Sequence, residues 1–106
     1  MLLVNQMQPG ERDQRVLDAV ASVRPQAKIV QFLADTPSQS EDIIALLVDD
    51  DVVVSFELSR VDHSAPATEI EVEDVRTYAR QVRGIHAKQL IKARAFAKAA
   101  VKRTSL

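Results

Sequence analysis

Two stretches of the chain show the spacing of amphipathic helices. Between Glu11 and Val23, apolar side chains recur at the i, i+3, i+4 and i+7 positions that share one face of a helix. Acidic Glu11 suits the N-terminal end of the helix dipole, and Pro25 cannot continue the helix. The same spacing returns over residues 75–82. The pattern therefore predicts one helix from Glu11 to Val23 and a second helix over 75–82.

The centre of the chain has the pattern of β-strands. Residues 52–61 alternate between two faces at period two, which is the strongest strand signal in the sequence. Residues 43–48 are wholly apolar, and a strand is favoured there because the aspartates that follow would oppose the negative end of a helix dipole. Residues 27–35 fit both a strand and a helix, and we favour the strand. Residues 69–73 predict a short edge strand protected by its acidic side chains.

Polar segments separate these strands. Residues 35–42 and 63–68 are rich in turn-forming side chains and predict loops. Asp50 and Asp51 predict a two-residue hairpin turn, although such turns prefer glycine and a longer loop is the alternative. A two-residue turn would gather six apolar side chains on one face of the sheet. They are Ile43, Ala45, Leu47, Val54, Phe56 and Leu58.

The other face of this hairpin is partly apolar too, so we expect both faces to need cover from helices or from a second copy of the chain. The predicted fold is an α+β domain over residues 1–106. It has an N-terminal helix, a mostly antiparallel sheet of three to four strands within about 27–72, and a helical C-terminus. That C-terminus is one long helix or two shorter ones, because Gly84 can end a helix or merely interrupt it.

Composition narrows the class of protein. The 106 residues are 46% hydrophobic and 27% charged, which indicates a folded core rather than a disordered polyelectrolyte. The absence of cysteine excludes disulfides, thiolate metal sites and a cysteine nucleophile. No apolar run approaches the roughly 18 to 20 residues of a membrane span. We therefore expect a cytoplasmic protein with no membrane partner.

The charge is divided unevenly along the chain. Residues 1–75 form an acidic body with five basic side chains and all fifteen acidic ones, whereas residues 76–106 form a basic helical segment with nine basic side chains and no acid. The formal net charge of the whole chain is nevertheless only -1. Such asymmetry suggests contact with a nucleic acid, a membrane surface or another protein.

The predicted helix over residues 85–103 concentrates this basic charge. One arc of its helical wheel is apolar and has His86 among its members. The apolar arc consists of Leu90, Ala93, Ala97, Ala100 and Val101. The other arc carries the candidate contacts to a nucleic acid or a protein partner, which are Lys88, Lys92, Arg94, Lys98, Lys102 and Arg103. The favoured interpretation is that this basic face is solvated or is neutralised by the acidic body, in the same chain or a neighbour, and contact with a phosphate backbone is the alternative.

Other reactive side chains give weaker signals. Residues 49–51 are three aspartates, but successive strand residues point to opposite faces, so we interpret them as a charged hairpin tip rather than a metal site. Asp62, His63 and Ser64 are the residue types of a hydrolase triad, yet the side chains of sequence neighbours diverge. We expect His63 to be solvated and His86 to be half-buried. With two glycines in the chain, no phosphate-binding loop can be built.

These observations predict no catalytic residues, no metal and no cofactor. The leading hypothesis is a small non-enzymatic interaction or regulatory protein, a homodimer that uses its basic C-terminal helix to contact a partner. The alternative is a nucleic-acid-binding protein that places the same helix on the phosphate backbone. A metal-dependent enzyme centred on the hairpin tip is the least favoured hypothesis.

Overall fold

The computed structural model describes residues 3–5 and 11–104, with side chains from residue 14 to residue 100. The elements run in the order β1 (Leu3–Asn5), α1 (Glu11–Val23), β2 (Ile29–Pro37), β3 (Glu41–Val48), β4 (Val52–Ser59), β5 (Thr68–Asp74), α2 (Val75–Gln81) and α3 (Gly84–Thr104). None of these helices combines the length and the apolar character needed to cross a bilayer.

The predicted α+β class is confirmed. In the described part of the chain, the sheet has five strands in the order β1-β2-β3-β4-β5. Strands β2 to β5 form an antiparallel meander, and β1 pairs with β2 in parallel through Leu3, Val4 and Asn5. The sequence analysis did not predict β1, because three residues are too few to show a period. Its connection to β2 passes through α1, as a parallel pair requires a crossover.

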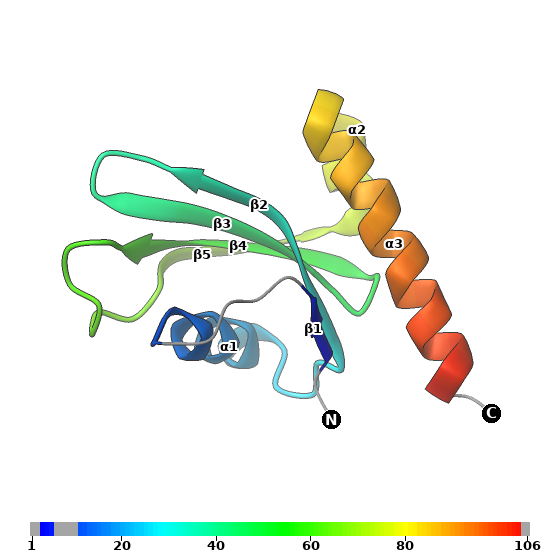
Figure 1. Ribbon diagram of the computed structural model, residues 1–106, viewed down its shortest axis with the longest axis horizontal. Coiled ribbons are helices and arrows are strands. Elements are labelled where there is room, and N and C mark those ends of the chain that lie inside the picture. Colours follow the sequence, from blue (N-terminus) through cyan, green and yellow to red (C-terminus); the bar gives the residue numbers. More distant parts are fainter. Residues whose placement is uncertain (1–2, 6–10, 105–106) are drawn as a thin grey trace.

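Helices cover both faces of the sheet, as the two-sided apolar pattern predicts. Helix α1 lies against one face, and α3 crosses the other face near one end of the strands (Figure 1). The core on the α1 side contains Val16, Val20, Val30, Ile44, Leu46, Val48, Val54, Phe56 and Leu58. The core on the α3 side contains Leu33, Leu47, Val53, Val75, Leu90 and Ala93. A third small cluster joins Ile29 to Ala97 and Ala100.

The predicted register of the central hairpin was wrong by one residue. In β3 and β4, Ile44 lies opposite Phe56 and Val48 lies opposite Val52. A shift of one residue turns every side chain to the other face. Phe56 therefore shares the α1 side with Ile44, whereas the α3 side receives Ile43 together with Glu57.

The geometry of the turn explains this register. The connection between β3 and β4 has three residues, Asp49 to Asp51, and the amide of Asp51 donates to the carbonyl oxygen of Val48 at 3.1 Å. Asp49 and Asp50 both have positive φ angles, 55° and 53°. Two central residues with positive φ are typical of the type I′ turn, and aspartate tolerates this conformation better than most side chains do. The tight turn is therefore centred one residue earlier than predicted.

Several element boundaries also differ from the prediction. The helix over residues 11–23 is confirmed, but β2 and β3 extend into the predicted loop at 35–42 and leave only residues 38–40 outside the strands. The ends of these two strands carry polar, exposed side chains, so the sequence pattern did not indicate that their backbones pair. At the C-terminus, Val82 is extended and Gly84 has a φ of 60°, so α2 and α3 are separate helices.

Neighbouring isoleucines of β3 test this register. Ile44 is fully buried, whereas Ile43 is 42% exposed on the opposite face. Truncation of a buried isoleucine leaves a cavity, so we expect Ile44→Ala to lower the free energy of unfolding by about 2 to 5 kcal/mol. The matched variant Ile43→Ala should lower it by less than about 1 kcal/mol, because part of its side chain already contacts water. Urea denaturation measures both variants, and equal losses would contradict the observed register.

Candidate functional site

Helix α3 is seated on the sheet by small side chains and one buried amide. Leu90, Ala93, Ala97 and Ala100 are buried, which confirms the predicted apolar arc at these four positions. The fully buried side chain of Gln31 in β2 donates from Nε2 to the carbonyl oxygen of Ala93 at 2.7 Å. Because alanine keeps the helix backbone close to the strands, a side chain from the sheet can reach a helix carbonyl. The helix is thus a fixed part of the fold.

Val101 and His86 are the other two residues of the predicted apolar arc. Val101 belongs to α3, but its side chain lies outside the described residues. The prediction that His86 is half-buried was wrong, because its side chain is exposed. His86 lies in the first turn of α3, a full turn before the buried Leu90, and the sheet does not cover that first turn.

The aspartates of the hairpin tip diverge toward different partners. Asp49 accepts hydrogen bonds from the backbone amides of Lys28 and Ile29, both at 2.9 Å. Arg24, just after α1, pairs with Asp51 at 2.9 Å and more distantly with Asp49. The tip thus links the end of α1 to the start of β2, instead of being only a solvated turn. Within the described residues, no three His, Asp or Glu side chains lie close enough together to hold a metal ion.

Asp50, the middle aspartate of the tip, pairs with α3. Its Oδ1 accepts a hydrogen bond from Nε of Arg94 at 2.8 Å, and both side chains are partly buried. This contact joins the basic helical segment to the acidic body. Among the side chains that the structure describes, it is the one ion pair between α3 and the strands.

The remaining predicted contact residues of α3 are placed differently. Lys88, Lys92 and Lys98 are exposed, and none has a carboxylate within ion-pair distance among the described side chains. The side chains of Lys102 and Arg103 lie outside the described residues. Neutralisation within the chain therefore accounts for Arg94, whereas these three lysines are exposed, as expected for a solvated face.

Helical spacing sorts the exposed side chains of α3 into three stripes. Gln89 donates to the carbonyl oxygen of Phe32 in β2, on the side away from the hairpin tip, whereas Arg94 points to the tip. Residues three, four or seven positions apart share a face. The sheet-side flank, which is the side of Gln89, consists of Ile85, Gln89 and Phe96. The tip-side flank, which is the side of Arg94, consists of Ile91, Arg94 and Lys98. Between them lies the outer stripe, which consists of Lys88, Lys92, Ala95 and Ala99.

The part of the sheet face beyond α3 is covered only in part, because α2 lies against β4 and β5 and Ala45 packs against the apolar cluster that includes Tyr78. Its first row across the strands, Ala34, Ala45, Ser55 and Glu71, follows directly after the residues buried under α3. Its second row is Thr36, Ile43, Glu57 and Thr68. We call these eight residues the open strip. None of them is fully buried, in contrast to Leu47 and Val53 under the helix.

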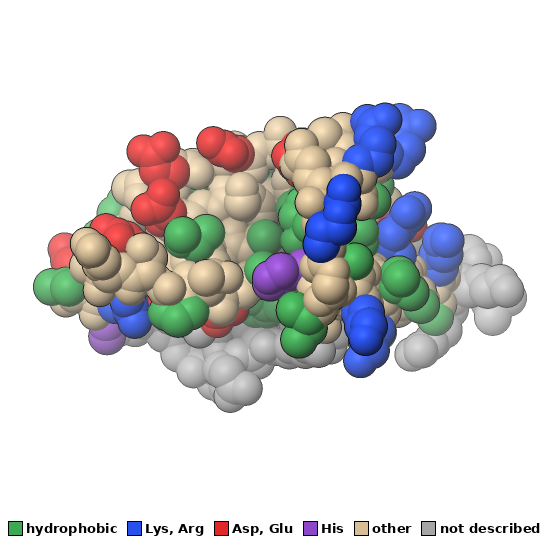
Figure 2. Space-filling model, turned by 90° about the horizontal axis from the view of Figure 1, so that it is seen from above, with side chains coloured by type: hydrophobic (Ala, Val, Ile, Leu, Met, Phe, Trp, Pro, Cys, Tyr) green, Lys and Arg blue, Asp and Glu red, His purple; other side chains and the backbone are tan. Residues whose placement is uncertain are grey.

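The open strip is acidic, and the helix beside it is basic. Glu41 and Glu73 lie on the same face as Glu57 and Glu71, because their partners in the register point to that face. Figure 2 looks down on this side of the molecule: Asp and Glu side chains gather over the strands away from the helix, and most Lys and Arg side chains gather on the helix side. Backbone, uncharged polar side chains and hydrophobic side chains lie between the two groups (Figure 2).

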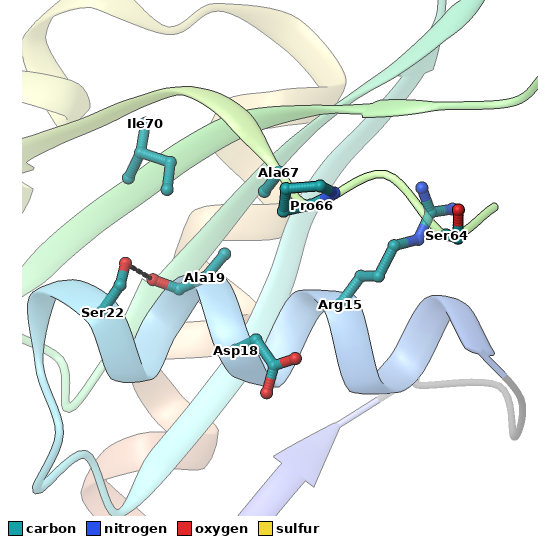
Figure 3. A pocket seen from close by; sticks show the side chains of 8 residues that line it. All are labelled: Arg15, Asp18, Ala19, Ser22, Ser64, Pro66, Ala67 and Ile70. Carbon is teal, nitrogen blue, oxygen red and sulfur yellow. Dashed lines mark hydrogen bonds between the residues drawn. The ribbon is translucent and has the colours of Figure 1, made fainter. Parts of the chain in front are cut away.

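A shallow pocket of about 230 Å³ lies on the opposite face, between α1 and the loop after β4 (Figure 3). Arg15 extends along it, and its Nη1 donates to the carbonyl oxygens of Ser59 and Ala65. Ser22 donates to the carbonyl oxygen of Ala19, and Asp18 accepts from Gln14. These contacts hold the polar side chains of the pocket within the fold, but the buried Nε of Arg15 has no hydrogen-bond partner among the described residues.

The triad-like residues do not form a catalytic relay. Ser64 donates to the carboxylate of Asp62 at 2.6 Å, and the ring of His63 instead contacts the carbonyl oxygen of Arg60 at 3.0 Å. The side-chain and backbone donors of Ser64 lower the pKa of the Asp62 carboxyl. These hydrogen bonds shape the loop after β4, and the serine hydroxyl contacts the carboxylate of Asp62 instead of the ring of His63.

Comparisons with protein families, with curated proteins and with solved structures give no significant match. The evidence about function is therefore the geometry itself. Sequence reasoning missed the open strip, since its extent depends on where α3 crosses the sheet. It also missed Gln31, although a lone polar residue inside the apolar run of 29–33 is the signal that could have indicated a buried anchor.

The contact between Arg94 and Asp50 is testable by a double-mutant cycle. Their side chains are 36% and 19% exposed, so solvent screens part of the attraction. We expect Arg94→Gln and Asp50→Asn to show a coupling of about 0.5 to 1 kcal/mol in the free energy of unfolding. Lys98→Gln, on the same flank of the helix, should change that free energy by less than about 0.5 kcal/mol. A coupling near zero would show that the pair does not help to seat α3.

Proposed function

We propose that the protein is a non-enzymatic interaction module that self-associates through α3 and the open strip. This proposal rests on two groups of oppositely charged side chains that lie on one side of the molecule and form no ion pairs with each other. The exposed lysines of α3 have no described acidic partner, and Glu57 and Glu71 have no Lys or Arg within ion-pair distance among the described residues. The basic part of this surface in one molecule is therefore complementary in charge to the acidic part in another.

These charges do not pair within one chain in the structure. Lys88 projects from the outer stripe of α3, away from the sheet, and Lys92 lies where the outer stripe meets the sheet-side flank. The glutamates project from the sheet face itself. A second molecule offers a way to bring the two sets of charges together.

Apolar side chains on the same surface support the proposal. Ile85 is 77% exposed on α3, and Ile43 is 42% exposed on the strip. Exposed ion pairs contribute about 0.2 to 1 kcal/mol each, so charge alone gives specificity rather than affinity. Burial of these isoleucines would supply the larger favourable term, at about 25 cal/mol per Å² of apolar surface.

Charge reversal on α3 tests this function. Light scattering coupled to gel filtration at tens of micromolar should show a dimer whose dissociation constant rises with salt. Lys92→Glu should raise the dissociation constant by about tenfold or more, because it places a carboxylate opposite an acidic surface. Lys98→Glu makes the same charge change on the tip-side flank and should have a much smaller effect. A wild-type chain that stays monomeric under these conditions would refute self-association.

The second candidate function is binding to a nucleic acid. It is supported by the absence of any acidic residue in 76–106 and by the exposed Arg80 and Arg83, which precede α3 on the same basic segment. Phe96 is the one aromatic residue in α3, so stacking on single-stranded bases is not expected. Contact would be made with phosphates, through Lys88, Lys92 and Lys98.

Salt-titrated fluorescence anisotropy with labelled duplex DNA and RNA distinguishes this candidate. Phosphate contacts predict affinity that falls steeply with salt, because each cation releases condensed counterions. Lys92→Glu and Lys98→Glu should then weaken binding to a similar degree, unlike their unequal effects on self-association. Binding that is absent at low ionic strength, or that is insensitive to salt, would eliminate the candidate.

A further inference from the structure

We infer that the outer edge of β5 is a docking site for an extended segment of another protein, in which apolar residues alternate with lysine or arginine. The segment adds to the sheet as a further strand beside β5, so that main-chain hydrogen bonds give affinity and alternate side chains give specificity. This inference goes beyond the proposed self-association and does not depend on it, because it uses the backbone of β5 and the surface beside α1 instead of α3.

The backbone of β5 has hydrogen-bonding groups that face outward. Among the described strands, β5 is last in the sheet order and pairs only with β4. The amide of Val75 donates to the carbonyl oxygen of Asp51 at 3.0 Å, in continuation of the β4–β5 register. Hydrogen-bonded pairs alternate with pairs that are not hydrogen-bonded in an antiparallel ladder, so Glu71 and Glu73 bond to β4. Val72 therefore directs both its N–H and its C=O away from β4.

The neighbouring peptide groups extend this outward row. In a trans peptide, the C=O of one residue and the N–H of the next residue point in opposite directions. Because the N–H of Glu71 faces β4, the C=O of Ile70 faces outward. Because the C=O of Glu73 faces β4, the N–H of Asp74 faces outward. With the two groups of Val72, the edge thus offers two donors and two acceptors to an added strand.

The α1 side of β5 adds an apolar surface beside this edge. Val72 and Ile70 are 50% and 36% exposed, and Val72 shares its side of the sheet with Val54, its register partner in the α1 core. Ile70 also lines the pocket of about 230 Å³, together with Ala19 of α1 and Ala67 just before β5 (Figure 3). Side chains of an added strand that point to the α1 side therefore lie beside this pocket and gain by being apolar.

Helix α1 runs alongside β5, so this apolar surface follows the edge. Near the start of β5, Arg15 of α1 donates to the carbonyl oxygen of Ala65. Near the end of β5, Arg24 pairs with Asp51, whose carbonyl oxygen accepts from Val75. The pocket and the exposed side chains of β5 therefore extend in the direction that an added strand takes.

The opposite side of β5 is acidic, and this charge determines which segment fits. Glu71 and Glu73 lie on the α3 side, as their register partners Ser55 and Val53 do. Neither glutamate has a Lys or Arg within ion-pair distance among the described side chains. Opposite charges that face each other across two strands stabilise the pairing, and like charges destabilise it. The residues of the added strand beside Glu71 and Glu73 are therefore basic.

The same charges exclude a second copy of β5 as the occupant. Two β5 strands paired edge to edge would bring Glu71 and Glu73 of both copies together on one face. The regular part of the edge is also short. Glu69 has a φ of 53°, and the register with β4 shifts beside it, so the regular edge covers residues 70–74. The site thus matches a short alternating segment rather than a long strand.

Hydrogen exchange measured by NMR tests the addition of a strand. The probe is a blocked peptide of about seven residues that alternates lysine with valine, and its matched control alternates glutamate with valine. In the free protein, the outward N–H of Val72 should exchange quickly, whereas those of Glu71 and Glu73 are protected by β4. Saturation with the lysine peptide should slow exchange at Val72 by about tenfold or more. Unchanged exchange at Val72, or equal slowing by the glutamate peptide, would overturn the inference.

Two substitutions in β5 distinguish strand addition from a general attraction between charges. Val72→Pro removes the outward N–H without removing a bond to β4, and an edge strand tolerates proline at such a position. Calorimetric titration should show that this variant raises the dissociation constant of the lysine peptide about tenfold or more. Glu71→Lys should raise it to a similar degree and should reverse the preference toward the glutamate peptide.

Glu41→Lys is the matched control for charge. It makes the same change on the same face but on β3, three strand spacings or about 14 Å from the added strand. This distance exceeds the screening length of about 8 Å at physiological salt, so the dissociation constant should change less than about twofold. Equal losses in Glu41→Lys and Glu71→Lys, or unchanged affinity in Val72→Pro, would contradict the inference.

These outcomes are separable from self-association. Lys92→Glu should not weaken binding of the lysine peptide, because α3 contacts β2 through Gln89 and Gln31 and lies away from the β5 edge. A monomeric wild-type chain that binds the peptide refutes self-association and supports the docking site. A dimer that does not bind the peptide overturns the docking site alone. Circular dichroism of each variant, with its unfolding midpoint in urea, verifies that a loss of binding does not come from a loss of fold.

Discussion

The β3–β4 hairpin is apolar on both faces, and this constraint determines the rest of the architecture. Ile44, Leu46 and Phe56 must be covered on one side, and Leu47 with Val53 on the other. A sheet with two apolar faces is stable only as the middle layer of three. Helix α1 closes the first side, and α2 with α3 closes the second. The cover is partial on both sides, because α3 lies over only one end of its face and Val72 and Ile70 of β5 stay 50% and 36% exposed on the α1 side.

The turn at the hairpin tip decides which residues remain uncovered. Asp49 and Asp50 adopt positive φ angles and set a register that directs Ile43 and Glu57 to the α3 side. With the register that a turn one residue later would impose, Ile43 would lie among the α1 core and Ile44 would face α3. In the same turn, Asp49 and Asp51 pair with Arg24 and Asp50 pairs with Arg94, so one short turn both selects the exposed face and anchors the helices around it.

Local patterns predicted the elements well, and long-range geometry accounts for what they missed. The helix over 11–23 and the alternation in 52–59 arise from periods within a single element. The register depends on the φ angles of two aspartates, and β1 depends on its pairing with β2. Neither feature produces a periodic pattern in the sequence. On α3, spacing alone identified the buried alanines and the exposed lysines. The open strip was not predictable in this way, because it combines residues from four strands with the crossing point of a helix.

The alanine seam of α3 connects the fold to its proposed interaction. Large side chains at Ala93, Ala97 and Ala100 would hold the helix farther from the sheet, out of reach of Gln31. Alanine instead lets the backbone of α3 lie close to the strands. The helix therefore stands only a short distance above the sheet face that also contains the open strip. The small side chains of this seam therefore determine how far the outer stripe of α3 stands above the strands.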